Sequence, residues 1–232
     1  MSAARLPRLK KCMTRLPFLF LFTVSFIWES GAQNVSRDPD PRATKLLIDL
    51  ETKIEQSKAV IYEFTLELNF PDEEPVIQKG TFLQSGDKHN LEIGEYGFVT
   101  DGQVSYWVID KQRKEIQIHD YTAPTDDDLT NPQALLKIYS NENFDYQMIG
   151  TGPAGESVIE FKPLRKGSDY IKARLSLSRS NMIEQIELFN RDGSRYVLNI
   201  HDINLSPRVE PNAFVVDPGK YQGYHVEDLR IE

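Results

Sequence analysis

Residues 80–110, GTFLQSGDKHNLEIGEYGFVTDGQVSYWVID, decide the fold class of this chain. Apolar and polar residues alternate in short runs there, and Gly, Asp or Asn separates one run from the next. This pattern is typical of β-strands joined by tight turns, so we predict a meander of four short antiparallel strands. The pair Asp101-Gly102 predicts a type I′ hairpin turn, because both central residues of that turn take positive φ angles.

The segment before this meander, residues 60–70, predicts a long amphipathic strand. From Tyr62 onward every second residue is aromatic or aliphatic, and the residues between them are polar. Such a strand buries one face and leaves the other in water. The apolar positions are Tyr62, Phe64, Leu66, Leu68 and Phe70.

Two helices are predicted, and each is opened by an N-cap residue that a proline follows. Asp40-Pro41 begins a helix that extends to about residue 57 and carries an apolar stripe at helical spacing. Asn131-Pro132 begins a short helix that ends near Tyr139. Further strands are predicted over residues 115–121, 144–149, 157–162, 171–178, 183–189 and 196–201. The chain is therefore predicted to be mainly β, with residues 41–232 as a single domain.

The first 32 residues have the organisation of a secretory signal peptide. A basic segment with Arg5, Lys10 and Arg15 precedes the uncharged apolar run 17–28, and Ser30-Gly31-Ala32 supplies small residues at a cleavage site. The run is too short for a membrane-spanning helix, which needs about 20 apolar residues. We expect export from the cytoplasm, with residues 33–40 as a flexible leader. An uncleaved anchor is the alternative, and Met13 is an alternative start.

Cysteine content and charge limit the function further. Cys12 lies in the signal segment, so the cleaved chain would have no thiol for catalysis, metal binding or a disulfide. Removal of residues 1–32 takes away five basic residues and one acidic residue and leaves 22 basic against 34 acidic residues, a net charge of -12. A protein so acidic repels nucleic acid and anionic membranes, so no nucleic-acid partner is expected.

No motif for catalysis or cofactor binding is present. The four histidines do not fall at metal-ligand spacing, and we expect them on wet faces of strands or in loops. Residues 126–128 are three aspartates, which could bind calcium. Such a run before a helix more often keeps the protein soluble and interacts favourably with the helix dipole. No serine-hydrolase elbow and no Gly-rich phosphate loop occurs. We therefore expect no enzyme activity, no metal and no cofactor.

Several motifs resemble the LolA family, the periplasmic carriers of outer-membrane lipoproteins. They are Gly80-Thr81-Phe82-Leu83, Leu91-Glu92-Ile93, and Val99-Thr100-Asp101-Gly102 with Trp107 a few residues on. The N-P-x-x-L-L pattern at 131–136 and the ending from Asn212 onward agree with them, and the resemblance implies a strand over residues 212–218. The resemblance implies a strongly curved antiparallel sheet that forms an incomplete β-barrel, with helices over its concave face as a lid.

The resemblance also implies a function and its partners. A LolA-like carrier accepts triacylated lipoproteins from an inner-membrane ABC transporter, shields their acyl chains in an apolar cavity and delivers them to an outer-membrane acceptor. A monomer is expected. A lipid-binding envelope sensor or adaptor on the same scaffold is the alternative.

The candidate site is an apolar cavity closed by the lid, although each cavity residue could equally be an ordinary core residue. The cavity set is Phe64, Leu66, Leu68, Phe82, Leu91, Ile93, Phe98, Trp107, Leu175 and Leu177, and the lid set is Leu135, Leu136 and Tyr139. The best-known family members carry an arginine before the strand that here holds Leu91, where it latches the lid. This chain has Asp87 there, so Lys88 is the candidate latch.

Overall fold

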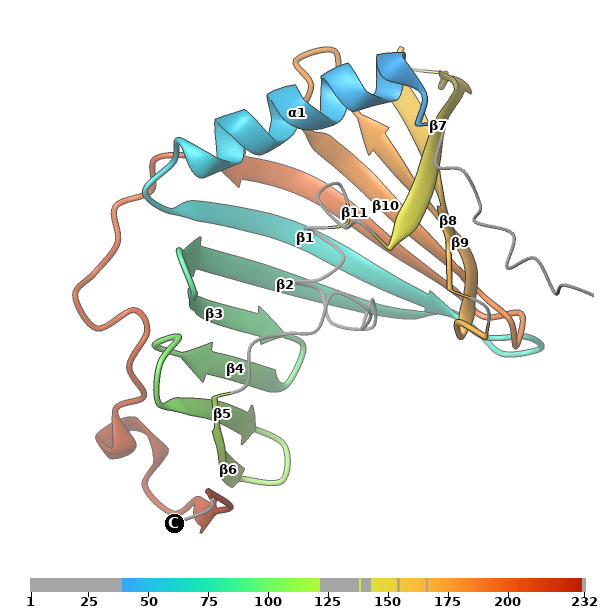
Figure 1. Ribbon diagram of the computed structural model, residues 1–232. Helices are drawn as coiled ribbons and strands as arrows, with labels where there is room; N and C mark the ends of the chain where they lie inside the picture. Colours follow the sequence, from blue (N-terminus) through green and yellow to red (C-terminus); the bar gives the residue numbers. More distant parts are fainter. Residues whose placement is uncertain (1–38, 122–137, 139–142, 154, 166, 231–232) are drawn as a thin grey trace, which may run out of the picture. The chain divides into compact units, whose positions relative to one another are not determined.

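The computed structural model describes residues 39–121, 138, 143–153, 155–165 and 167–230, within a compact unit of residues 35–232. These residues form one α-helix and one sheet of twelve strands (Figure 1). The predicted signal peptide and most of the leader lie outside the described residues. No helix among the described residues is long and apolar enough to cross a membrane.

The sheet is open and almost wholly antiparallel. Its strand order is β12-β6-β5-β4-β3-β2-β1-β11-β10-β9-β8-β7, and only β12 pairs in parallel, with β6. Because β7 and β12 stand at opposite edges, the sheet does not close into a barrel, and the predicted mainly β, incomplete-barrel fold is confirmed. The elements are α1 (Pro41–Glu55), β1 (Val60–Asn69), β2 (Val76–Ser85), β3 (Lys88–Ile93), β4 (Tyr96–Thr100), β5 (Ser105–Asp110), β6 (Glu115–Asp120), β7 (Phe144–Thr151), β8 (Ser157–Pro163), β9 (Tyr170–Leu177), β10 (Ile183–Asn190), β11 (Arg195–Asn204), a short 3-10 helix η2 (Pro218–Tyr221) and β12 (His225–Asp228).

The main core lies between α1 and one face of the sheet, here called the inner face (Figure 1). The strand register places apolar residues side by side across it: Leu66 pairs with Leu198, and Leu198 with Ile186. Ile186 in turn pairs with Leu175, and Leu175 with Ile159. Period-two alternation thus gives one continuous apolar face from β1 to β8, as the sequence of β1 predicts.

A second, smaller core lies on the opposite, outer face of the sheet, over β4 to β6. Val216, Tyr221 and Tyr224 from the C-terminal segment pack there, and the Asn90 side chain donates a 2.8 Å hydrogen bond to the carbonyl oxygen of Ala213. The strand predicted over residues 212–218 is wrong: the segment forms turns, and β12 begins only at His225. The sheet residues of this core are Val99, Trp107, Ile109, Ile116 and Ile118.

Helix α1 begins where the sequence predicts. The Asp40 carboxylate accepts a hydrogen bond from the backbone N–H of Arg42, and Pro41 is the first helical residue. Ala43, Leu47 and Leu50 are buried on the side that faces the sheet. The N–H of Asp40 also donates to the carbonyl of Tyr146, and the Met148 N–H donates to the Asp40 carboxylate, so the helix start is fixed to β7.

The turn at Asp101-Gly102 differs from the predicted type I′ turn. Gly102 has a φ of 74°, but Asp101 is not among the described residues with positive φ. The Asp101 carboxylate instead accepts hydrogen bonds from the N–H groups of Gln103 and Val104, at 2.9 and 3.1 Å. A side-chain-capped loop therefore joins β4 to β5, as Asp allows when its carboxylate bonds to the backbone a few residues on.

Candidate functional site

The structure brings most of the predicted cavity residues together on the inner face. Eight of them belong to the main core or pack against it. Leu68, half-buried, follows them on β1, where it pairs with Tyr196. Trp107 does not join them, because it packs in the core of the outer face. The eight are Phe64, Leu66, Phe82, Leu91, Ile93, Phe98, Leu175 and Leu177.

The lid residues Leu135, Leu136 and Tyr139 lie outside the described residues. Ile138, which the sequence places in the same predicted helix, is described: it is 1% exposed and belongs to the main core with Phe82 and Leu91. One residue of the predicted lid segment therefore contacts the apolar cluster of the inner face.

A chain of aromatic rings crosses the inner face from β1 to β5. The ring centroids of Tyr62 and Phe82 are 6.1 Å apart, and those of Phe82 and His89 are 6.0 Å apart. His89 lies 5.8 Å from Tyr106, which lies 6.2 Å from Phe98. Rings at these separations attract one another beyond the effect of simple area burial. This half of the inner face is therefore a largely aromatic surface.

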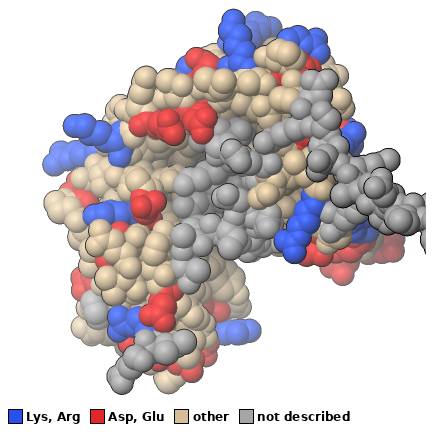
Figure 2. Space-filling model, viewed as in Figure 1, with Lys and Arg blue, Asp and Glu red and all other residues tan. Residues whose placement is uncertain are grey.

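Burial also determines the electrostatics of this surface. It raises the pKa of Tyr62 to about 12 and that of Tyr106 to about 12, because the charged phenolate loses its solvation. Both hydroxyls thus stay neutral over the range in which proteins function. On the side of the molecule seen in Figure 2, charged side chains stand in small groups among uncharged residues. The neutral Tyr62 and Tyr106 hydroxyls and the aromatic rings of the inner face are suited to apolar groups rather than to ions.

His89 is the one residue of this surface that the sequence misplaces. It is 4% exposed and packs between Phe82 and Tyr106, so the prediction that it lies on a wet face is wrong. Period-two spacing in the sequence indicates its true position, because His89, Leu91 and Ile93 must share one face of β3.

The same alternation bears on the predicted latch. Lys88 is exposed and shares the outer-face side of β3 with Asn90, whose side chain bonds to the C-terminal segment. The position that points to the inner face is His89. Lys88 is thus placed away from the face that a lid would cover.

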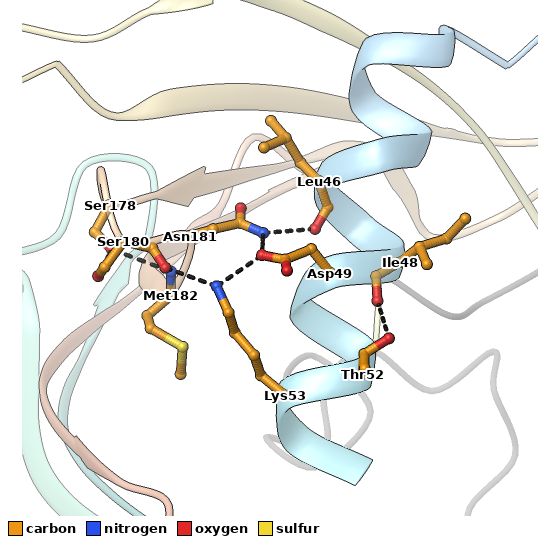
Figure 3. A network of polar contacts seen from close by, with 9 residues as sticks. All are labelled: Leu46, Ile48, Asp49, Thr52, Lys53, Ser178, Ser180, Asn181 and Met182. Atoms are coloured by element: carbon orange, nitrogen blue, oxygen red, sulfur yellow. Dashed lines mark hydrogen bonds and ion pairs between the residues drawn. The ribbon is translucent and has the colours of Figure 1, made fainter. Parts of the chain in front are cut away.

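A group of polar contacts holds α1 to the turn between β9 and β10 (Figure 3). The Asn181 amide donates to the Leu46 carbonyl at 2.8 Å and to the Asp49 carboxylate at 2.7 Å. The Lys53 ammonium lies 2.6 Å from Asp49 and donates to the Ser180 carbonyl at 2.9 Å. Since both partners of the Asn181 nitrogen are acceptors, the orientation of its amide is fixed. These contacts, here called the helix clasp, keep α1 over the inner face.

Asn181→Ala is expected to lower the free energy of unfolding by about 1–2 kcal/mol. The change removes both donated bonds and places Ala at a φ of 58°, a left-handed conformation that Asn tolerates better than Ala. Asn181→Gly removes the same bonds without backbone strain, so it should cost less. Urea denaturation of the three proteins measures the difference. Equal stability of wild type and both variants would contradict the importance of the clasp.

Acid should loosen the clasp. The Lys53 ammonium, followed by the Asn181 amide, holds the pKa of Asp49 below its ordinary value of 3.8. Because the folded protein prefers the carboxylate, these contacts stabilise it fully above that ordinary value and are lost as the pH falls through the lowered pKa. Asp49→Asn should therefore reduce the fall in urea midpoint between about pH 6 and pH 3. An unchanged pH profile would show that Asp49 gains nothing from its partners.

The described residues contain no group of three or more His, Cys, Asp or Glu side chains that could hold a metal ion. The three aspartates at 126–128 lie outside them. What the described geometry offers is an extensive apolar and aromatic core on one face of an open sheet, in which Phe64, Phe82 and Leu175 are each 2% exposed or less.

Comparison with protein-family models gives no match, and comparison with curated proteins gives none. Among solved structures, a LolA superfamily protein from Nitrosomonas europaea is 12% identical, covers 76% of this chain and 98% of its own, and has a TM-score of 0.41. Lipoprotein LppX from Mycobacterium tuberculosis is 11% identical, with coverages of 74% and 100% and a TM-score of 0.40. A DUF1329 family protein from Desulfovibrio piger is 10% identical, with coverages of 80% and 100% and a TM-score of 0.43.

Proposed function

We propose that this chain is a periplasmic lipid-binding protein that carries the acyl chains of lipoproteins on the inner face of its sheet. The observation that carries the proposal is the continuous apolar inner face of a sheet that does not close, with a single helix over it among the described residues. Ligand sites are lined predominantly by apolar and aromatic side chains, as this face is. The resemblance of the sequence motifs to LolA is the reason to propose a lipoprotein as the cargo.

The energetics fit a carrier. Burial of an acyl chain contributes about 0.8 kcal/mol per CH₂ group, so a lipoprotein released from a membrane needs an apolar site throughout its passage. The open edges of the sheet allow such a site to load and unload without unfolding. In this proposal the chain receives triacylated lipoproteins from an inner-membrane ABC transporter and gives them to an outer-membrane acceptor.

Phe98→Glu tests the site. Phe98 is half-buried on the inner face, so a charge placed there reaches water at limited cost to folding while it disrupts the apolar surface. We expect binding of a fluorescent fatty acid to weaken by about tenfold or more, because a carboxylate next to an acyl chain loses solvation.

Ile77→Glu is the matched control, since Ile77 is 63% exposed on β2. It should leave fatty-acid binding unchanged. Equal binding by the Phe98→Glu variant, with its thermal unfolding intact, would remove the inner face as the lipid site.

A further inference from the structure

Four basic side chains gather on the outer face of β8 to β11. Their exposed fractions are 60% for Lys162, 25% for Lys172, 35% for Arg174 and 46% for Arg195. Lys172 and Arg174 alternate with the core residue Ala173 on β9, so they point away from the apolar inner face. These four residues are here called the basic outer surface.

Two carboxylates lie beneath these cations rather than beside them. Glu160, whose side chain is 9% exposed, contacts Lys172 at 2.9 Å, Arg174 at 3.1 Å and Lys162 at 3.7 Å. Glu187, at 13% exposed, pairs with Arg195. These two negative charges are thus largely hidden. A further carboxylate on this face, Asp145 of β7, lies opposite Lys162 at the edge of the basic outer surface.

The Phe189 ring holds the cations in place. Lys172 and Arg174 each lie 5.1 Å from its centroid, and Arg195 lies 5.2 Å from it. Cations at this distance from a ring are attracted by its π electrons. Because the ring and the two carboxylates fix these side chains before any partner binds, binding costs less side-chain entropy.

We propose that the basic outer surface binds an acidic segment of a partner protein. Guanidinium groups bind carboxylates with two parallel hydrogen bonds, and the surface presents two of them with two ammonium groups. The whole chain has a net charge of -8, so a membrane or nucleic acid, which meets much of the protein at once, is repelled. A short acidic segment meets only the local cations, since charges beyond about 10 Å are screened.

This surface lies on the face of the sheet opposite the apolar core, and none of its four side chains belongs to that core. A partner protein can therefore dock while the inner face is occupied. Such a surface suits recognition of the loaded protein by a protein at its origin or its destination.

The test uses the chain from Gln33 onward and a fluorescent peptide rich in Glu, with the same-length Gln peptide as a blank. We expect the Glu peptide alone to bind at low ionic strength, and backbone NMR signals of β8 to β11 to shift. Lys162→Gln with Arg195→Gln should weaken binding by about fivefold or more. Lys162→Gln alone, at the most exposed position, should give part of this loss if the double variant is unstable.

Arg113→Gln with Arg208→Gln is the control, because it changes the net charge equally at side chains that are 72% and 92% exposed elsewhere. It should leave peptide binding within about twofold of wild type. Equal weakening by both double variants, or no binding of the Glu peptide, would overturn the proposal. A second result would also overturn it: the protein binds vesicles of anionic phospholipid through Lys162 and Arg195 but does not bind the Glu peptide.

Discussion

Gly80→Ala is expected to lower the free energy of unfolding by about 3 kcal/mol. Gly80 lies in β2 opposite Phe64 of β1 and Ile93 of β3. A Cβ atom at this position would overlap the Phe64 ring and come within 2.7 Å of the Glu92 carbonyl oxygen. The ring is 2% exposed and the oxygen belongs to the backbone, so neither can move cheaply. Gly80 therefore leaves the space that the Phe64 ring needs on the inner face.

Gly97→Ala is the matched control in β4. Its Cβ would lie 3.5 Å from the Ile109 side chain, an ordinary contact, so stability should change by less than about 1 kcal/mol. Phe64→Leu should cost less in the Gly80→Ala background than in wild type, because the smaller side chain relieves the clash. Urea denaturation measures wild type, the three single variants and the double variant. Equal losses at Gly80 and Gly97 would show that the Phe64 contact does not explain the glycine.

Phe82→Ala is expected to cost about 3–5 kcal/mol, the usual range for deleting a fully buried ring. Phe82 is 0% exposed and lies between the rings of Tyr62 and His89. Its loss leaves a cavity in the centre of the aromatic surface that rigid strands cannot fill. Tyr96→Ala, at the 38%-exposed end of the same surface, should cost about 1 kcal/mol or less.

The urea midpoint and its slope separate these outcomes, since an unchanged slope means that only stability has changed. A loss for Phe82→Ala no larger than that for Tyr96→Ala would contradict the packing described for the inner face. Because the same rings form the proposed lipid site, the two variants should also differ in fatty-acid binding.

Period-two alternation in the sequence correctly predicts the inner face of β1 and β3, since polar and apolar residues there are well separated. It fails at β5, where Tyr106, Trp107, Val108 and Ile109 are all apolar or aromatic. Either face is then possible, and only the pairing of Trp107 with Val99 places it on the outer face. The choice of Trp107 as a cavity residue fails for this physical reason.

Long-range packing explains what else could not be read from the sequence. The family resemblance implies a strand around Val216, but this C-terminal segment instead packs on the outer face of β4 to β6, where Val216 is buried. The helix clasp also joins Asn181 to Leu46 and Asp49, which lie 135 and 132 positions earlier in the chain. No local pattern around Asn181 identifies its partners on α1.

The measurement that tests the carrier proposal most directly is release of lipoprotein from energised inner-membrane vesicles or spheroplasts of the protein's own organism. The chain from Gln33 onward is added, and the soluble fraction is examined for lipoprotein bound to it. The proposal predicts an ATP-dependent soluble complex that forms with the Ile77→Glu variant and not with the Phe98→Glu variant. Absence of any complex, with the protein folded and the transporter active, would contradict the carrier function.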